Sequence, residues 1–253
     1  MFEAFIARLQ QGHRTMRYPD GPAPELPDRF VGRPVLDKSG CRECGECADA
    51  CPVGALTVVD GGPQLDTGAC LFCRQCELAC THGGVHFTKE HRLAGARRED
   101  LIVKPGPATI AKAYSEEIHK RFGRSLKLRQ VSAGGCNACE ADSNVLNTLA
   151  WDLGRFGVQF VASPRHADAL LITGPVTENM LLALTKTYEA VPAPKFVIAV
   201  GACAIAGGPY RGHAECHDGA SGTLKVDLFI PGCPPHPLTI LDGILRVLGK
   251  VGE

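Results

Sequence analysis

The heptapeptide GGCNACE (residues 134–140) ends an apolar run and opens a helical pattern, and its two cysteines lie three residues apart. Two further cysteines, Cys203 and Cys233, each follow an apolar run far downstream. Iron–sulfur clusters are held in proteins by cysteine thiolates. We therefore interpret Cys136, Cys139, Cys203 and Cys233 as the four ligands of one iron–sulfur cluster.

Strand and helix patterns alternate around this heptapeptide. Strand-like apolar runs lie at 126–131, 158–161, 169–173, 196–200 and 226–230, and helical patterns lie at about 140–152, 176–190 and 237–249. Such alternation is typical of a parallel α/β sheet, in which ligands bind at the carboxyl ends of the strands. Because the four cysteines come just after predicted strands, we expect the sheet to gather them at one edge.

The composition excludes several classes of protein. The chain has 253 residues, of which 45% are apolar, with 27 basic and 27 acidic residues. This charge balance argues against a nucleic-acid-binding protein, which would carry an excess of basic residues. The longest apolar run, at 196–206, is about half as long as a membrane span requires. Glu3 and Arg8 interrupt any apolar core of a secretory signal.

Thirteen cysteines are far more than an ordinary intracellular domain carries. They indicate either a disulfide framework or metal sites. The odd number, the lack of a secretory signal and the close spacing of the cysteines all favour metal, and an iron–sulfur protein in particular.

Eight of these cysteines form an internal repeat. The run CRECGECADACP (residues 41–52) has the spacing CxxCxxCxxxCP that bacterial ferredoxins use for 4Fe–4S clusters. A second copy, CLFCRQCELAC (residues 70–80), lies 29 residues further along the chain, although Thr81 stands where a proline is usual. Zinc is the alternative metal, but zinc sites usually pair two CxxC units. The repeat therefore resembles a two-cluster ferredoxin domain.

This resemblance implies which cysteines bind together. In two-cluster ferredoxins, the fourth cysteine of each run ligates the cluster of the other run. Carried over to this sequence, the first cluster is held by Cys41, Cys44, Cys47 and Cys80, and the second by Cys51, Cys70, Cys73 and Cys76.

Three segments connect or precede these motifs. Residues 1–17 have apolar side chains at the spacing of an amphipathic helix, which is expected to pack on this protein or a partner; a membrane surface would call for more basic residues. Five prolines make residues 18–34 an extended strap. Residues 92–129 are predominantly basic and include a predicted helix at 108–122; they form either a solvated face or a contact with an acidic partner.

Residues 126–249 resemble the small subunit of the energy-converting, complex I-related nickel–iron hydrogenases of the formate hydrogenlyase and hydrogenase-4 type. They are also similar to the 20 kDa subunit family of respiratory complex I, and residues 1–90 resemble the ferredoxin-like subunit of the same complexes. The chain thus resembles a fusion of two electron-carrying subunits. The stretches that carry the resemblance are GGCNACE (134–140), SPRHADALLITGPVT (163–177), GACAIAGG (201–208) and VDLFIPGCPPHP (226–237).

The resemblance implies an α+β ferredoxin-like two-cluster domain followed by an α/β flavodoxin-like parallel-sheet domain. It also makes Cys136, Cys139, Cys203 and Cys233 the ligands of a proximal 4Fe–4S cluster, the third in the chain. The expected organisation is an N-terminal helix and strap (1–34), the two-cluster domain (35–91), a basic linker and helix (92–125) and the small-subunit domain (126–253).

The implied function is electron transfer from a low-potential donor, through three 4Fe–4S clusters, to a nickel–iron large subunit that reduces protons or oxidises hydrogen. The family also implies membrane subunits and a place on the cytoplasmic face of the membrane. The spacing CNACE favours the hydrogenase class, because complex I has adjacent cysteines at this position. The alternatives are a complex I-like chain that delivers electrons to quinone beside a 49 kDa-like large subunit, a soluble ferredoxin-type adaptor and, least favoured, a cluster-assembly scaffold.

Several other residues have two interpretations. Glu140 is either a carboxylate favoured by the first turn of a helix or a proton relay beside the proximal cluster. Arg165 and His166 either form a polar loop or face the large subunit. His213, Cys216 and His217 only weakly suggest a metal site, and Cys216 is expected to remain a thiol without metal.

Overall fold

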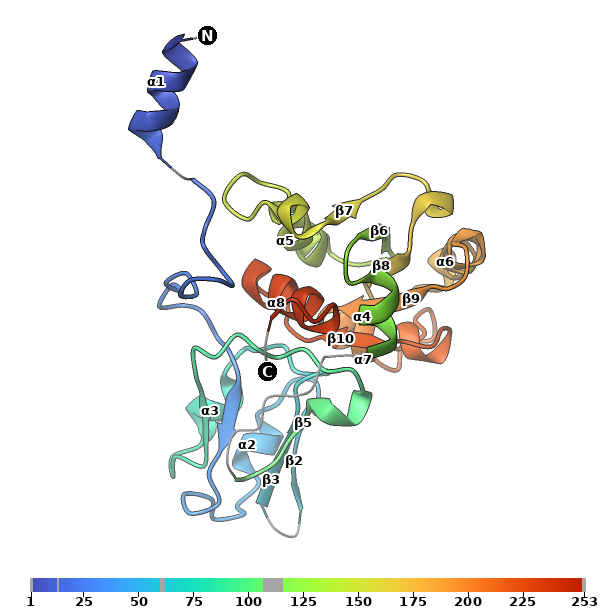
Figure 1. Cartoon of the computed structure of the whole chain (residues 1–253). Helices are drawn as coiled ribbons and strands as arrows, with labels where there is room; N and C mark the ends of the chain where they lie inside the picture. Colours follow the sequence, from blue (N-terminus) through green and yellow to red (C-terminus); the bar gives the residue numbers. More distant parts are fainter. Residues whose placement is uncertain (1, 13, 60–61, 107–115, 252–253) are drawn as a thin grey trace.

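The computed structural model describes residues 2–12, 14–59, 62–106 and 116–251 (Figure 1). It contains a small N-terminal region with two antiparallel sheets and a larger C-terminal region with one parallel sheet. This arrangement confirms the predicted order of a ferredoxin-like domain followed by a flavodoxin-like domain. Among the described helices, none combines the length and the apolar character that crossing a bilayer requires.

The N-terminal region is built around its cysteine loops. A two-stranded sheet pairs β1 (Pro34–Leu36) with β4 (Val85–Phe87), and a three-stranded sheet has the order β2 (Leu56–Val59), β3 (Gly62–Asp66), β5 (Ile102–Val103). Two short helices, α2 (Glu46–Asp49) and α3 (Gln75–Ala79), each contain the third cysteine of a repeat, Cys47 or Cys76. With so few regular elements, the cysteine loops make up much of the interior.

The C-terminal sheet has five parallel strands in the order β7-β6-β8-β9-β10. Numbered along the chain from β6, this order is 2-1-3-4-5, which is that of flavodoxin. β8 and β9 are buried along their whole lengths, which explains their unbroken apolar sequences. The strands are β6 (Leu126–Ser132), β7 (Val158–Phe160), β8 (Ala169–Thr173), β9 (Phe196–Val200) and β10 (Leu228–Ile230).

Helices cover this sheet; α4 precedes its first strand, and the others follow strands of the sheet. They are α4 (Glu116–Phe122), α5 (Ala138–Val145), α6 (Glu178–Ala190), α7 (Gly201–Ala206) and α8 (Pro237–Val247). Two predicted helices need correction or qualification, and one helix was missed. The helix predicted at 140–152 ends at Val145, because the chain then turns toward Asp152, whose φ is 46°. The short helix α7 was not predicted. Of the helix predicted at 108–122, α4 forms the last part, and 108–115 lie outside the described residues.

The two regions share apolar contacts and a backbone bridge. Gly95 exchanges two backbone hydrogen bonds of 3.0 and 2.9 Å with Phe229 of β10, so the segment after β4 lies along the edge of the large sheet. Leu56 and Leu65 belong to the same apolar cluster as Ile205 of α7. The cysteine loops are therefore packed against the sheet that carries the other four cysteines.

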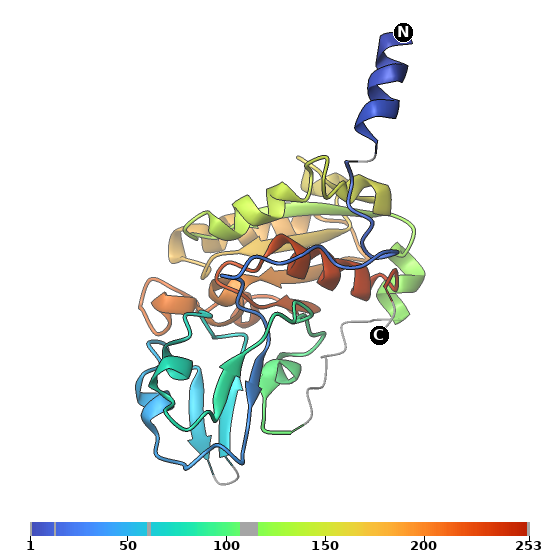
Figure 2. The ribbon, with the colours of Figure 1, turned by 90° about the vertical axis from the view of Figure 1, so that its left-hand side faces the viewer.

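The strap between α1 (Phe2–Gln11) and β1 crosses α8, as Figure 2 shows. Its contact with α8 is a buried polar network in which the Tyr18 hydroxyl donates to Asp242 at 2.6 Å and Arg246 Nε donates to the same carboxylate at 2.8 Å. Arg155 donates to the carbonyl oxygens of Met16 and Tyr18, both at 2.6 Å. The extended strap predicted at 18–34 thus has a fixed path over the C-terminal region.

Candidate iron–sulfur centres

The first group of thiols surrounds a small cavity in the N-terminal region. Its lining includes Cys41, Cys44, Cys47 and Cys80. Burial, and then repulsion by the thiols of Cys80 and Cys41, raises the pKa of Cys47. Cys80 belongs to the second repeat and the other three cysteines to the first, so the structure brings together the set implied by the ferredoxin resemblance.

The second group shows the reciprocal exchange. Burial, and then repulsion by neighbouring thiols, raises the pKa of Cys70 to about 12 and that of Cys76 to about 11. Cys51 and Cys73 are among those neighbours in both cases. Cys51, from the first repeat, therefore lies with the three cysteines of the second.

The third group lies where β6, β9 and β10 end. Burial and repulsion by Cys203, Cys233 and Cys136 raise the pKa of Cys139. The same effects raise the pKa of Cys203 to about 11. β6 and β8 are the neighbours at which the strand order reverses, and this switch point is where open α/β sheets place their ligands. The four predicted cysteines thus meet at one edge of the sheet, as expected.

These donor sets fit 4Fe–4S clusters. Four thiols in one place repel one another when ionised, and buried thiolates are unfavourable unless iron compensates their charge. Backbone N–H groups are already directed at the sulfurs: Ala55 donates to Cys51 Sγ at 3.2 Å, Phe72 to Cys70 Sγ at 3.3 Å and Gly84 to Cys80 Sγ at 3.2 Å. Within the described ranges, no three His, Cys, Asp or Glu side chains are arranged to hold a single metal ion.

Gly201 leaves the space that the third group needs. Its φ is 88°, and a Cβ atom placed on it would lie 2.5 Å from Cys139 Sγ. Only glycine therefore combines the left-handed backbone with this close approach to the sulfur. Gly201, the first residue of GACAIAGG, therefore leaves room for the Cys139 thiol, while Cys203 of the same stretch belongs to the third group.

We expect Gly201→Ala to lower the iron content of the protein by about four atoms, because the added methyl group displaces Cys139. Gly212→Ala is the matched control, since Gly212 has a φ of 78° and nothing within 4 Å of the added Cβ. The control should lose about 1 kcal/mol through backbone strain alone and keep its iron. Iron assay of the two purified variants makes the comparison, and equal iron contents would contradict the role of Gly201.

The second and third groups are neighbours. Repulsion by Cys73 contributes to the raised pKa of Cys233, so the two thiols lie close together across the contact of the two regions. Cys136 and Cys233 are both exposed. The third group therefore faces the second group on one side and the surface of the chain on another.

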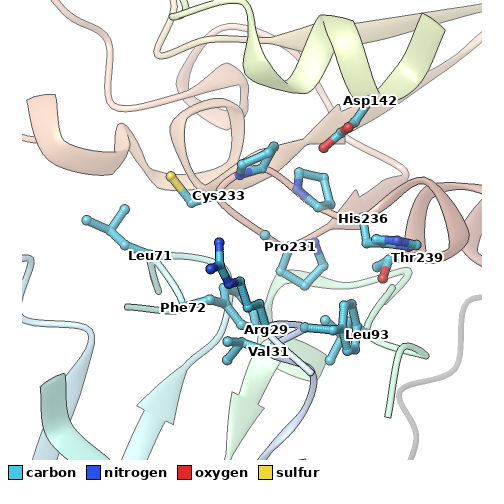
Figure 3. A pocket seen from close by; sticks show the side chains of 14 residues that line it. Arg29, Val31, Leu71, Phe72, Leu93, Asp142, Pro231, Cys233, His236 and Thr239 are labelled. Carbon is cyan, nitrogen blue, oxygen red and sulfur yellow. The ribbon is translucent and has the colours of Figure 1, made fainter. Parts of the chain in front are cut away.

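A cavity of about 280 Å³ lies beside Cys233 (Figure 3). Phe30 of the strap and Phe72 of the second cysteine loop form part of its apolar wall. Its polar lining includes His236 at the start of α8 and Thr239, whose buried hydroxyl has no hydrogen-bond partner among the described residues. Sequence reasoning missed this cavity because its walls come from five segments that are separated in the sequence.

Glu140 is buried, with 6% of its surface exposed, close to Cys139 and Cys203. Two hydroxyl groups donate to its Oε1 atom: Thr173 at 2.7 Å and Ser132 at 2.5 Å. Ser132 is exposed at the end of β6. Neither hydroxyl was predicted as a site residue, although both lie at the ends of predicted strands.

The remaining site predictions have different outcomes. Arg165 and His166 lie in a turn directly before β8 and so are not brought to the third group, which follows the carboxyl ends of strands. The imidazole of His217 bonds to the carboxylate of Glu178 at 2.7 Å, and no group of three metal-binding side chains is found around it among the described residues. Cys216 lies close enough to Cys203 to raise the pKa of that thiol.

A ferredoxin-like region and a flavodoxin-like sheet that both present grouped cysteines define an iron–sulfur electron-transfer protein. Residues 136–247 match the family model of the NADH ubiquinone oxidoreductase 20 Kd subunit, and residues 40–84 match that of a 4Fe-4S dicluster domain. The chain belongs to the 20 Kd subunit family and carries a 4Fe-4S dicluster domain before the family region.

Three relatives illustrate the similarity. The probable membrane-bound hydrogenase subunit mbhJ of Pyrococcus furiosus is 41% identical over 137 residues, which cover 54% of this chain and 82% of that protein. Formate hydrogenlyase subunit 7 of Escherichia coli is 36% identical over 164 residues, 64% of each protein. An NADH-quinone oxidoreductase subunit of Geotalea daltonii is 41% identical over 119 residues, 47% of this chain and 69% of that protein.

Proposed function

We propose that this chain is the electron-transfer small subunit of a complex I-related nickel–iron hydrogenase and carries three 4Fe–4S clusters. The observation that carries the proposal is the convergence of four cysteines at the carboxyl edge of the sheet, with Cys233 next to Cys73. The proposed ligands are Cys41, Cys44, Cys47 and Cys80 for the first cluster, Cys51, Cys70, Cys73 and Cys76 for the second, and Cys136, Cys139, Cys203 and Cys233 for the third.

The proposed domains follow these sets. Residues 1–34 form the N-terminal helix and strap, 35–91 the two-cluster domain, 92–125 the linker and 126–253 the small-subunit domain. The distribution of the cysteines supports this division, because residues 35–91 contain two complete sets and residues 126–253 contain the third, whereas residues 1–34 and 92–125 contain no cysteine.

The positions of the cysteines suggest the direction of the path within the chain. Each bound cluster would accept one electron and release it again. Cys73 of the second set and Cys233 of the third set lie close together. Electrons would therefore enter at the first cluster and pass through the second cluster to the third. Cys136 and Cys233 reach the surface, where a large subunit can approach the third set.

Glu140 is proposed as a proton relay at this exit. Its Oε1 atom accepts hydrogen bonds from Thr173 inside and from the exposed Ser132 hydroxyl, so the carboxylate connects the neighbourhood of Cys139 with the surface. A carboxylate held in this way can take up and pass on a proton without moving the cysteines.

We expect Glu140→Gln to lower hydrogen turnover of the complete complex by roughly 10²-fold, because an amide cannot exchange a proton as a carboxylate does. Reduction of the clusters by dithionite, followed by electron paramagnetic resonance, should be unchanged. Asp142→Asn, a partly buried carboxylate two residues further along the chain, is the control and should retain turnover. Full turnover in the Gln variant would remove Glu140 from the path and leave the electron route standing.

The partners follow from the class. We propose a nickel–iron large subunit at the surface of the third set, membrane subunits that hold the complex at the cytoplasmic face, and a low-potential electron donor at the first set. Two relatives with hydrogenase or formate hydrogenlyase in their names, and the two-residue spacing between Cys136 and Cys139, support the hydrogenase class.

A second candidate function is delivery of electrons to quinone, beside a 49 kDa-like large subunit. The cavity beside Cys233 favours it, because apolar and aromatic walls with His236 and Thr239 suit a carbonyl-bearing ring. The similarity to the NADH-quinone oxidoreductase subunit of Geotalea daltonii points the same way. A soluble ferredoxin-type adaptor is the third candidate.

Purification of the chain with its native partners separates these candidates. The hydrogenase proposal expects a nickel-containing large subunit and about 12 iron atoms on this chain. A nickel-free complex whose activity depends on quinone would establish the second candidate instead. A chain that purifies with an enzyme but without membrane subunits would support the adaptor.

A further inference from the structure

α1 is the one described α-helix in which no residue is buried. Figures 1 and 2 show it extending away from the rest of the molecule in both views. Four large apolar side chains on it are exposed to solvent: Phe2 at 78%, Phe5 at 62%, Ile6 at 40% and Leu9 at 68%. Apolar side chains of this size are normally buried, so the helix has a surface that needs a partner.

These four residues form one stripe. They are spaced i, i+3, i+4 and i+7, which places them on the same side of a helix with 3.6 residues per turn. The same spacing describes the anchors of an amphipathic helix that lies in an apolar groove of another protein. An isolated helix of ten residues is marginal in water, so packing of this stripe would also stabilise the helix itself.

The segment after α1 is attached to the C-terminal region. Met16 donates its backbone N–H to Ala150 at 3.0 Å, the Thr15 hydroxyl donates to Leu149 at 3.1 Å, and Arg155 donates to the Met16 carbonyl at 2.6 Å. The Leu149 side chain is 69% exposed beside this attachment. The segment that follows the C-terminal end of α1 is therefore attached at a defined point on the surface, and the exposed side chain of Leu149 lies beside that point.

The charges on α1 distinguish a protein groove from a lipid surface. A helix that lies on an anionic bilayer carries a strongly basic polar face. α1 has one acidic residue, Glu3, and one basic residue, Arg8, so its polar face is neutral overall. Arg14 and Arg17 come after the helix, on the attached segment.

We propose that α1 docks through Phe2, Phe5, Ile6 and Leu9 into an apolar groove of a neighbouring protein subunit. This inference rests on the proposed membership of a multisubunit complex. It adds a second point of attachment, separate from the surface at Cys136 and Cys233, on the side where α5 ends. Such a two-point attachment would hold this chain in the complex even when the contact at the cysteines is weak.

The test compares two variants of the complete complex, purified from cells. Phe5→Glu places a carboxylate in the apolar stripe, and Ala4→Glu places the same group on the opposite, exposed side of the helix. We expect Phe5→Glu to lower the yield of this chain in the complex at least tenfold, whereas Ala4→Glu leaves it unchanged. Iron content of the isolated chain should be equal in both variants, which shows that the cysteine regions are intact.

A photo-crosslinking amino acid at Phe5 is expected to label one protein subunit of the complex. Three results would overturn the inference: normal assembly of the Phe5→Glu complex, labelling of a second copy of this chain, or Phe5-dependent sedimentation of the isolated chain with vesicles of phosphatidylglycerol and phosphatidylcholine. A wild-type chain that never enters a multisubunit complex would instead refute the proposed function.

Discussion

Replacement of Cys203 by serine is expected to reduce the iron content of the purified chain from about 12 atoms to about 8. Cys203 lies in the short helix α7 that follows β9, and its thiol interacts with Cys233 and Cys136 from two loops. The other eight predicted ligands lie in the N-terminal region and form their own groups. The signals of those two clusters in electron paramagnetic resonance should therefore remain while the third disappears.

Cys216→Ser is the matched control for this experiment. Cys216 lies close to Cys203 but is the one cysteine of the thirteen that belongs to none of the three proposed sets. The control should retain all of the iron and all three signals. Loss of iron from Cys216→Ser, or retention of about 12 atoms in Cys203→Ser, would show that the third set has been assigned wrongly.

Replacement of Asp242 by alanine is expected to lower the free energy of unfolding of the C-terminal region by about 3–5 kcal/mol. Asp242 is completely buried in α8 and accepts hydrogen bonds from Tyr18 and Arg246, which are 7% and 6% exposed. Alanine removes the carboxylate and leaves the guanidinium charge inside the protein without this compensation. Urea unfolding followed by circular dichroism at 222 nm measures the change.

Two further variants make the Asp242 result specific. Tyr18→Phe removes one hydrogen bond to the same carboxylate and should cost about 1–2 kcal/mol, since the strap remains in place. Glu189→Ala breaks the exposed pair with Lys186 and should change the stability by less than about 0.5 kcal/mol. If Asp242→Ala were no more harmful than Glu189→Ala, the buried network would not hold the strap on α8.

Sequence reasoning succeeded where the determining interactions are local. The parallel sheet was predicted because strand and helix patterns alternate along the chain. The unbroken apolar runs of β8 and β9 agree with it, since both strands are buried along their whole lengths. Helix ends were less accurate: α5 ends at Val145 instead of near 152, since the turns that follow depend on how Leu146 and Leu153 pack in the core. The helix propensities of the residues at 140–152 alone do not predict that packing.

The candidate site shows the same division. The CxxC spacings and the repeat offset predicted ten cysteines as ligands, and the apolar runs before Cys203 and Cys233 added two more. The order of strands and loops was enough to expect four of the twelve at one sheet edge. The hydroxyl partners of Glu140 were missed, because Ser132 and Thr173 become its neighbours only when β6 and β8 pair. The proximity of Cys216 to Cys203 was also missed, because the spacing of these residues in the sequence does not show how the chain between them folds.

Within each run the cysteines are separated by two or three residues. This spacing determines the metal chemistry, because it places neighbouring thiolates on one turn of the chain without any contribution from distant segments. The alternation of strands and helices likewise determines the class of fold. The tertiary structure alone decides that Cys73 lies beside Cys233, that Glu140 meets two hydroxyls and that α1 extends from the surface unpacked. These features join segments far apart in sequence, and their contacts exist only after the strap, the cysteine loops and the sheet have packed together.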